Sequence, residues 1–381
     1  MRTRAAILYE MERPGPYAIS RPLVVEEVDL AGPGPGQVLV EVAAAGVCHS
    51  DLSVVDGTRP RVMPMVLGHE AAGIVRELGR DVRDLRVGEH VVLSFVPACG
   101  QCLQCAVGRP ALCLNGNRAN AAGCLLDGSR HFLDRQGRTL HHHLGVSAFS
   151  QFTVVARESL ILIEPGIPLE TAAMFGCAVI TGVGAVVNTA RIFPGSSVSV
   201  FGLGGVGLSV VMGARAAGAD PILAVDVIAT KLELAGRLGA THKIDARNTD
   251  PVEAVRSLTG GGTEYTFECA GAEDSLAKAY AATARGGTTV TLSLPHPSRH
   301  LSIAAVSLVI EERTVKGSYM GSAVPRRDIP RFLAMHRAGL LPVEQLVSRT
   351  LGLDDINEAF DALAQGQVVR QLVHFGAAMS A

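Results

Sequence analysis

The sequence predicts an α/β protein built from two domains, the first rich in β strands and the second doubly wound. Three observations predict this fold class. The chain has 381 residues, which is more than one hydrophobic core usually spans. Strand-like apolar alternation runs through the first half, as in QVLVEVAAA at 37–45. A valine-rich strand, a glycine turn and an alanine-rich helix then follow one another at 198–219.

The composition limits the partners of the chain. A formal net charge of −2, with 18% charged residues, gives neither a basic surface for nucleic acid nor an acidic tail. We therefore expect a small-molecule partner, no nucleic acid and no membrane. The opening MRTRAAILYE reaches charged residues before any apolar run long enough for a signal peptide, so we expect a cytoplasmic protein.

Residues 171–214 raise the question of a membrane span, because Arg191 is their one charged residue. Six glycines between positions 195 and 213, together with Pro194, argue against a lipid-facing helix. A buried parallel strand, a glycine turn and a packed helix explain the segment better.

Four cysteines gather in the stretch CGQCLQCAVGRPALC. They are Cys99, Cys102, Cys105 and Cys113. In a reducing cytosol such a cluster is more often a metal site than a set of disulfides. Four thiolates complete the tetrahedral shell of Zn²⁺ and leave no position for a substrate, so the predicted zinc is structural. Free thiols are the alternative, and the regular spacing argues against them.

A second set of possible ligands is dispersed along the chain. Cys48 lies in GVCHSD, His69 in LGHEAAGIV and Cys177 in FGC. Taken singly, each is ordinary, because a lone cysteine is usually a small core residue and a lone histidine a hydrogen-bonded loop residue. Together they are the ligand set of a catalytic zinc that keeps its fourth position open. Cys124 and Cys269 have no partner pattern and are expected to be inert thiols.

The glycine turn in VFGLGGVG has the spacing GxGxxG, at Gly202, Gly204 and Gly207. This motif is weak alone, since glycines also make ordinary turns, but here a strand precedes it and a helix follows it. The next strand, ILAVD, ends in Asp226, about 20 residues beyond the last glycine. A carboxylate there accepts hydrogen bonds from an adenosine ribose and repels a 2′-phosphate. NAD is therefore expected rather than NADP.

With these motifs in place, the chain resembles a medium-chain, zinc-dependent alcohol dehydrogenase of the liver-type long form, a group that includes the glutathione-dependent formaldehyde dehydrogenases. The resemblance runs from RAAILYE to QVVRQLVHF, through GHEAAG, CGQCLQC, DGSRHF, LHHHLG, FSQFTVV, VFGLGGVG, VKGS and INEAF. It implies a GroES-like catalytic domain over 1–178 with a structural zinc lobe at 96–115. It also implies a Rossmann NAD-binding domain over 179–320 and a return to the first domain over 321–381. Retention of the segment 118–139 implies a homodimer.

The resemblance also implies roles for single residues. Cys48, His69 and Cys177 would bind the catalytic zinc, one of two Zn²⁺ per subunit. Glu70 would stand behind it as an occasional ligand, Asp51 would accept a hydrogen bond from His69, and Ser50 would relay the hydroxyl proton. The residues implied for NAD are His49, Thr181, Gly202, Leu203, Gly204, Gly205, Val206, Gly207, Asp226, Lys231, Leu294 and Arg370. The residues implied for the substrate pocket are Phe95, Leu144, Leu294 and Tyr319.

Several of these residues have ordinary alternatives. Asp51 as a solvated surface acid and Glu70 as a salt-bridge partner need no zinc. His49, Lys231 and Arg370 as solvated side chains need no nucleotide, and the pocket residues as core residues need no substrate. The histidine run at 141–143 invites a metal interpretation, but three successive rings on a strand do not aim at one ion.

The implied function is reversible hydride transfer between a primary aliphatic or arylalkyl alcohol and NAD. Two alternatives remain: a thiol-dependent formaldehyde dehydrogenase that oxidises an S-hydroxymethyl-glutathione-like adduct, and a non-catalytic NAD-binding protein on the same fold. Ser53 stands where the liver enzymes commonly place a relay histidine, and it cannot act as a base near neutral pH. Asn117, followed by Arg118, replaces the glutathione-binding arginine of the formaldehyde-dehydrogenase branch, and GTRPR at 57–61 also differs. Plain alcohol oxidation is therefore expected ahead of adduct oxidation.

Overall fold

The computed structural model describes residues 1–375 and divides the chain into two compact units. Unit 1 contains Met1–Cys177, Val324–Pro330 and the chain from Val347 onward. Unit 2 contains Ala178–Ala323 and Arg331–Leu346. The segment Arg331–Leu346, expected with the first domain, groups with unit 2 because its buried apolar residues, including Val343 and Leu346, pack there beside the helix after the glycine turn.

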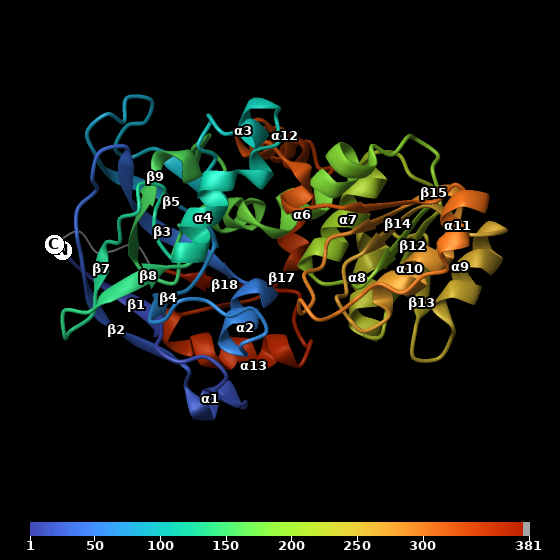
Figure 1. The fold of residues 1–381 in the computed structure, drawn as a ribbon, viewed down its shortest axis with the longest axis horizontal. Coiled ribbons are helices and arrows are strands. Elements are labelled where there is room, and N and C mark those ends of the chain that lie inside the picture. Colours follow the sequence, from blue (N-terminus) through green and yellow to red (C-terminus); the bar gives the residue numbers. More distant parts are fainter. Residues whose placement is uncertain (376–381) are drawn as a thin grey trace. The chain divides into compact units, whose positions relative to one another are not determined.

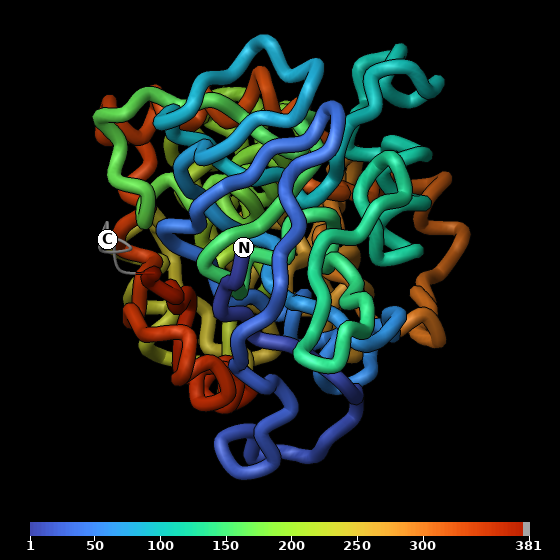
Figure 2. The backbone as a smooth tube through the Cα atoms, turned by 90° about the vertical axis from the view of Figure 1, so that its left-hand side faces the viewer, coloured from blue at the N-terminus to red at the C-terminus, as the bar shows by residue number. Residues whose placement is uncertain are grey.

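Unit 1 begins with a closed barrel. Its strands, in order around the barrel, are β1 (Arg2–Leu8), β2 (Leu23–Leu30), β7 (Phe132–Leu133), β8 (Thr139–His142) and β4 (Met65–Val66). β2 pairs antiparallel with the whole of β1, and Figure 2 shows this N-terminal run in blue. Ile7, Leu30 and Phe132 belong to the apolar core that the barrel strands enclose.

A second sheet of unit 1 carries the elements of the candidate site. Its order is β10 (Leu160–Ile163), β6 (His90–Leu93), β5 (Glu70–Leu78), β3 (Gln37–Val47), β18 (Arg370–His374) and β17 (Val347–Leu351), and β9 (Phe152–Ala156) pairs with β3. β3 lies between β5 and β18, so three strands from distant parts of the chain meet there. Gly46 pairs with Glu70 on one side, and Val47 pairs with Gln371 on the other.

The helices of unit 1 are short. The α helices are α1 (Tyr17–Ser20), α2 (His49–Val55), α3 (Leu103–Ala106), α4 (Leu114–Ala122), α5 (Leu169–Ala173) and α13 (Ile356–Ala364). The 3₁₀ turns are η1 (Pro110–Leu112), η2 (Arg157–Ser159), η3 (Met174–Gly176) and η7 (Leu353–Asp355). α13 packs beside α1, at opposite ends of the sequence (Figure 1), and Asp361 accepts a hydrogen bond from the Tyr17 N–H at 2.6 Å.

Unit 2 is a six-stranded parallel sheet. Its order is β13 (His242–Asp245), β12 (Ile222–Asp226), β11 (Val198–Phe201), β14 (Thr263–Glu268), β15 (Thr283–Thr291) and β16 (Thr314–Gly317). In chain order this is 3-2-1-4-5-6, the doubly wound arrangement whose ligand site lies where the strand order reverses. The doubly wound fold predicted from the sequence is confirmed. β11 is buried on both faces, and its one polar side chain, Ser199, is hydrogen-bonded to the hydroxyls of Thr263 and Thr266.

The helices of unit 2 flank this sheet. They are α6 (Ala178–Gly184) with its π-helical continuation η4 (Ala185–Ala190), α7 (Gly205–Ala216), α8 (Ala229–Leu238), α9 (Pro251–Thr259), α10 (Ser275–Ala282), α11 (Ala305–Ile310), η5 (Met320–Ser322) and η6 (Val343–Leu346). α12 (Pro325–Arg337) begins in unit 1 and ends in unit 2. α6 packs so closely on α7 that position 182 requires a glycine, because a Cβ there would lie 2.5 Å from the Cβ of Ser209.

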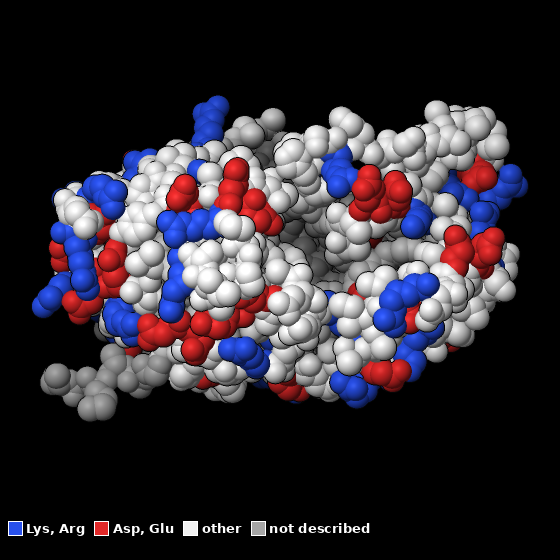
Figure 3. Space-filling view, turned by 90° about the horizontal axis from the view of Figure 1, so that it is seen from below, with Lys and Arg blue, Asp and Glu red and all other residues white. Residues whose placement is uncertain are grey.

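Across residues 1–375, no single helix is long and apolar enough to cross a membrane. One pair of helices separated by a bend, Leu169–Gly176 with Ala178–Ala190, has the length and the apolar composition of a span when the two are taken together. On the face drawn in Figure 3, the side chains of Lys and Arg intermingle with those of Asp and Glu, as the small net charge of −2 leads one to expect.

Candidate metal centre and nucleotide site

Three dispersed side chains of unit 1 converge on one point. The Sγ atoms of Cys48 and Cys177 and a ring nitrogen of His69 lie within 4.8 Å of one another. Cys48 joins β3 to α2, His69 immediately precedes β5, and Cys177 follows η3. All three are buried, with exposed fractions of 7% or less. The candidate catalytic site therefore lies wholly within unit 1.

Two glycines allow this convergence. Gly46 pairs with Glu70 across β3 and β5, and a Cβ at Gly46 would lie 2.6 Å from Oε1 of Glu70. Gly68 has a φ of +91°, and a Cβ there would lie 2.5 Å from the backbone nitrogen of Phe149. A larger residue at either position would displace the backbone that carries Cys48 or His69.

Asp51 organises the polar groups around His69. Its Oδ1 lies 2.9 Å from Nδ1 of His69 and accepts a hydrogen bond from the Gly68 N–H at 3.2 Å. Its Oδ2 accepts from the Cys48 N–H at 3.2 Å, so the same carboxylate closes the first turn of α2. Bonding to Asp51 places the proton of a neutral His69 on Nδ1. Nε2 of His69 is buried and has no hydrogen-bond partner among the described residues.

The charges of this cluster favour a cation. The Cys177 thiol donates to Cys48 and, although burial opposes ionisation, that bond and the charge of Arg370 hold the pKa of Cys48 well below its usual value. The same contact and burial raise the pKa of Cys177, so the two sulfurs share one proton. Burial lowers the pKa of His69, but Asp51 and Cys48 outweigh it and raise that pKa well above its usual value. The donor set and the orphaned Nε2 fit Zn²⁺.

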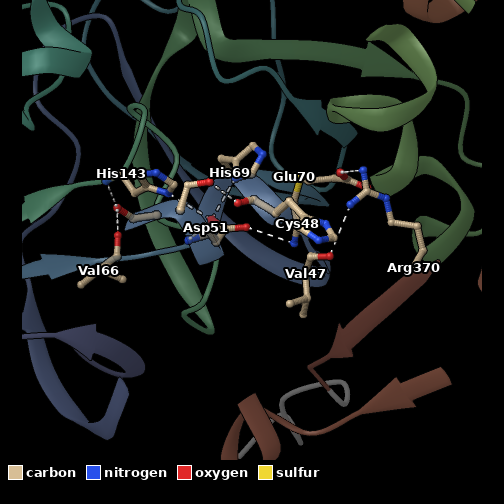
Figure 4. A network of polar contacts seen from close by, with 12 residues as sticks. Val47, Cys48, Asp51, Val66, His69, Glu70, His143 and Arg370 are labelled. Atoms are coloured by element: carbon tan, nitrogen blue, oxygen red, sulfur yellow. Dashed lines mark hydrogen bonds and ion pairs between the residues drawn. The ribbon is translucent and has the colours of Figure 1, made fainter. Parts of the chain in front are cut away.

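Glu70 and Arg370 form a buried pair behind Cys48 (Figure 4). Nη2 of Arg370 lies 3.3 Å from Oε2 of Glu70, and Nη1 donates to the carbonyl oxygen of Val47 at 3.3 Å. Burial raises the pKa of Glu70 to about 7, and the charge of Arg370 opposes that rise. Burial lowers the pKa of Arg370, but Glu70 and the thiols of Cys48 and Cys177 raise it by more, so this pKa lies above its usual value. Arg370 therefore keeps its positive charge beside the cluster.

The four cysteines of the predicted lobe also converge. The sulfur atoms of Cys99, Cys102, Cys105 and Cys113 lie within 4.8 Å of one another. Cys113 is the N-cap of α4, and its Sγ accepts from the N–H groups of Gly116 and Cys99, each at 3.3 Å. Backbone N–H groups also lower the pKa of Cys102 to about 6. Burial raises the pKa of Cys105 and of Cys113, so it is the convergence of the four sulfurs that fits a cation site.

The glycine turn of unit 2 leaves a helix end open. Gly202 has a φ of +90°, and a Cβ at Gly207 would lie 1.9 Å from the carbonyl oxygen of Gly202. α7 starts directly after Gly204, and no side chain within residues 1–375 caps its first turn. Asp226, at the end of β12, accepts from the Leu203 N–H at 2.6 Å. An uncapped helix start beside a carboxylate suits the pyrophosphate and ribose of a dinucleotide.

The remaining residues predicted for the site are divided between unit 1 and unit 2. In unit 1, His49 and Ser50 occupy the first turn of α2, and the ring of Phe95 meets that of His69 edge to face at 5.6 Å. Ser53 donates to the carbonyl oxygen of His49 at 2.7 Å. The others are Leu144 in unit 1, which is buried, and Thr181, Gly205, Val206, Lys231, Leu294 and Tyr319 in unit 2.

His143 is the site residue that the sequence reasoning missed. The three successive histidines point to different partners: His141 accepts from Nε of Arg130 at 2.9 Å, His142 accepts from the His131 N–H at 3.3 Å, and His143 lies 3.1 Å from Asp51. Alternation along β8 separates His141 from His142, but His143 follows the end of that strand, so the sequence held no signal for its contact with Asp51.

Comparisons with known proteins agree with this geometry. Residues 34–165 match a family model described as an alcohol dehydrogenase GroES-like domain, and residues 205–337 match one described as a zinc-binding dehydrogenase. An S-(hydroxymethyl)glutathione dehydrogenase from Synechocystis is 38% identical over 98% of this chain and 100% of its own length. A zinc-binding alcohol dehydrogenase domain protein from Burkholderia ambifaria has a TM-score of 0.93 at 34% identity, over 98% of this chain and 99% of that one. Benzyl alcohol dehydrogenase from Acinetobacter calcoaceticus has a TM-score of 0.92 at 30% identity, over 99% and 100%.

Proposed function

Because this chain belongs to the zinc-dependent medium-chain alcohol dehydrogenases, with a GroES-like and a Rossmann-type domain, we propose that it transfers hydride between a primary hydroxymethyl group and NAD. The observation that carries the proposal is the convergence of Cys48, His69 and Cys177, in which Nε2 of His69 is buried and has no hydrogen-bond partner among residues 1–375. Zn²⁺ held by these residues supplies a Lewis acid with an open position. A second Zn²⁺ at the four-cysteine lobe gives two per chain. Thiolate sites of this kind suit a reducing cytoplasm.

The protein's own residues would divide the remaining work. Asp51 fixes the tautomer of His69 through the 2.9 Å contact. The Phe95 ring packs edge to face with that of His69 and would restrict its rotation. Ser50, two residues after Cys48, would take the hydroxyl proton and pass it outward. The hydroxyl of Ser53 is engaged with the backbone of His49, so proton release would continue through water.

For the substrate, the relatives favour the thiol adduct over the plain alcohol expected from the sequence. Proteins named S-(hydroxymethyl)glutathione dehydrogenase are 38% identical over nearly the whole chain, whereas the benzyl alcohol dehydrogenase is 30% identical. Arylalkyl alcohols remain the second candidate.

A substrate panel tests this function. We expect NAD reduction with formaldehyde only when glutathione is added, with a kcat/KM at least about tenfold above that for benzyl alcohol, a difference of about 1.4 kcal/mol. A preference for benzyl alcohol would assign the site to arylalkyl alcohols instead. No NAD reduction with any primary alcohol or adduct would contradict the proposed activity.

The choice of nucleotide depends on the charge of Asp226. Asp226→Asn keeps an oxygen for the Leu203 N–H but removes the charge that would repel a 2′-phosphate. We expect the ratio of kcat/KM for NAD to that for NADP to fall at least about tenfold. Asp245→Asn, at the end of the neighbouring strand β13, is the matched control and should leave the ratio unchanged. An unaltered preference in Asp226→Asn would exclude this residue as the selector.

A second copy of the chain would cover the edge of unit 2. β16 ends the sheet, and among the described strands it pairs with β15 alone. The adjacent α11 exposes Val306, Val309 and Ile310, with Val309 77% exposed. An open strand edge beside exposed apolar residues favours self-association, here as a homodimer. Light scattering should give twice the chain mass, and Val309→Glu should halve it while Val87→Glu does not. A monomeric parent protein would contradict the dimer.

A further inference from the structure

A second histidine shares the carboxylate that orients His69. Nδ1 of His143 lies 3.1 Å from Oδ1 of Asp51, the same oxygen that lies 2.9 Å from Nδ1 of His69. All three side chains are essentially inaccessible, with exposures of 1% or less. The rings of His69 and His143 also meet edge to face at 5.5 Å. Figure 4 shows His143 and His69 gathered around Asp51.

The backbone of His143 is anchored next to the same turn. Its N–H donates to Oγ of Ser147 at 2.9 Å, and that hydroxyl donates to the carbonyl oxygen of Val66 at 2.9 Å. The N–H groups of Val146 and Ser147 both donate to the His143 carbonyl oxygen. Val66 lies three residues before His69, so the two histidines are fixed to one short piece of backbone.

The contact between His143 and Asp51 suits a donor facing an acceptor. Carboxylate oxygens accept hydrogen bonds, so a ring nitrogen that faces one favours the tautomer with the proton on Nδ1. Nδ1 of His143 makes no hydrogen bond of standard geometry among the described residues, so the 3.1 Å approach to Asp51 is its one polar contact there. Two ring nitrogens therefore flank one carboxylate oxygen, which restricts rotation of the carboxylate between them.

We propose that His143 is a positioning residue that acts through Asp51 to hold Nε2 of His69 in its ligating orientation. The inference rests on the proposed function, since it assigns His143 to the same cation site. Without the second donor, Asp51 can turn about its side chain, and His69 then loses the contact that aims its ring. The site would release its cation faster, while the four-cysteine lobe would not change.

The test compares variants that differ in the donor. His143→Phe keeps a flat ring without a donor, and His143→Leu does so with a smaller side chain. His143→Asn retains an N–H at the branch position of Nδ1. Transfer of zinc from the intact protein to an excess of a chromogenic chelator is followed over time, with the more slowly released zinc of the lobe as internal reference. The visible spectrum of the cobalt-substituted protein is recorded for each variant.

We expect His143→Phe and His143→Leu to accelerate release of one zinc about tenfold and to shift the cobalt bands. His143→Asn should stay within about twofold of the parent protein. Zinc release at the parental rate in His143→Phe and His143→Leu would overturn the proposal. Release accelerated as much in His143→Asn as in those two variants would also overturn it. A third zinc bound by Asp51, His69 and His143 would also overturn it, because these atoms lie within 4.8 Å of one another. These readouts need no turnover, so they are independent of the substrate panel.

Discussion

Replacement of Cys48 by Ala should abolish hydride transfer, with kcat/KM lowered by about 10⁴-fold or more, which corresponds to about 5.5 kcal/mol of transition-state stabilisation. Cys48 provides the sulfur that ionises first in the cluster, because Cys177 donates to it and Arg370 lies beside it. Removing it leaves two ligands, which is fewer than a catalytic zinc site uses. Initial rates of NAD reduction give the effect, and calorimetric titration measures NAD binding.

The matched control for this prediction is Cys124→Ala. Cys124 is also buried, but its thiol contacts the carbonyl oxygen of Ala119 and belongs to neither cysteine cluster. We expect this variant to keep parental rates. Both variants should bind NAD as the parent does, because the glycine turn and Asp226 belong to the other unit. Parental turnover in Cys48→Ala would remove this residue from the catalytic site.

Replacement of Cys102 by Ala should lower stability without removing the chemistry. Its sulfur lies 3.9 Å from that of Cys113, within the four-cysteine lobe. With three ligands the lobe holds its cation weakly, and we expect a loss of about 3 kcal/mol, or a fall in Tm of about 6–12 °C. Thermal unfolding followed by circular dichroism measures the loss, and the rate assay at low temperature checks that activity remains.

Val107→Ala serves as the control for the lobe, because Val107 is exposed and contributes no ligand. It should shift Tm by no more than about 1–2 °C. If Cys102→Ala melted at the parental temperature, the lobe would not depend on a bound cation for its stability.

The doubly wound unit could be predicted from local sequence. Valine alternation at Val198–Phe201, the glycines of the turn and the acid at the end of β12 each act through contacts with residues near them in the chain. The packing demand at Gly207, whose Cβ would collide with Gly202, is likewise local. Patterns of this kind survive in a single sequence because their physical cause lies within about 20 residues.

The metal site was less accessible to local reasoning. The spacing of the four cysteines indicated one site directly, but Cys48, His69 and Cys177 were grouped by the chemistry of their ligand set and by resemblance to a family, with no spacing to join them. Their meeting depends on pairing between β3 and β5 and on the turn at η3, which bring together residues more than a hundred positions apart. The histidine run was noted, but His143 received no role because its partner, Asp51, lies on a different element.

Two other features depended on tertiary context. The amphipathic helix α12 passes from one unit to the other, and no local pattern marks the point at which the packing changes. The residues that surround a substrate come from several elements, so the sequence alone favoured a plain alcohol where the relatives favour a thiol adduct.

Metal content per chain tests the central claim most directly. Elemental analysis of the purified protein should find two zinc ions per chain in the parent and one in Cys48→Ala, with the NAD affinity equal in both. The remaining ion should belong to the four-cysteine lobe and be lost when Cys102 is also replaced. Equal zinc content in the parent and in Cys48→Ala would contradict a zinc site formed by Cys48, His69 and Cys177.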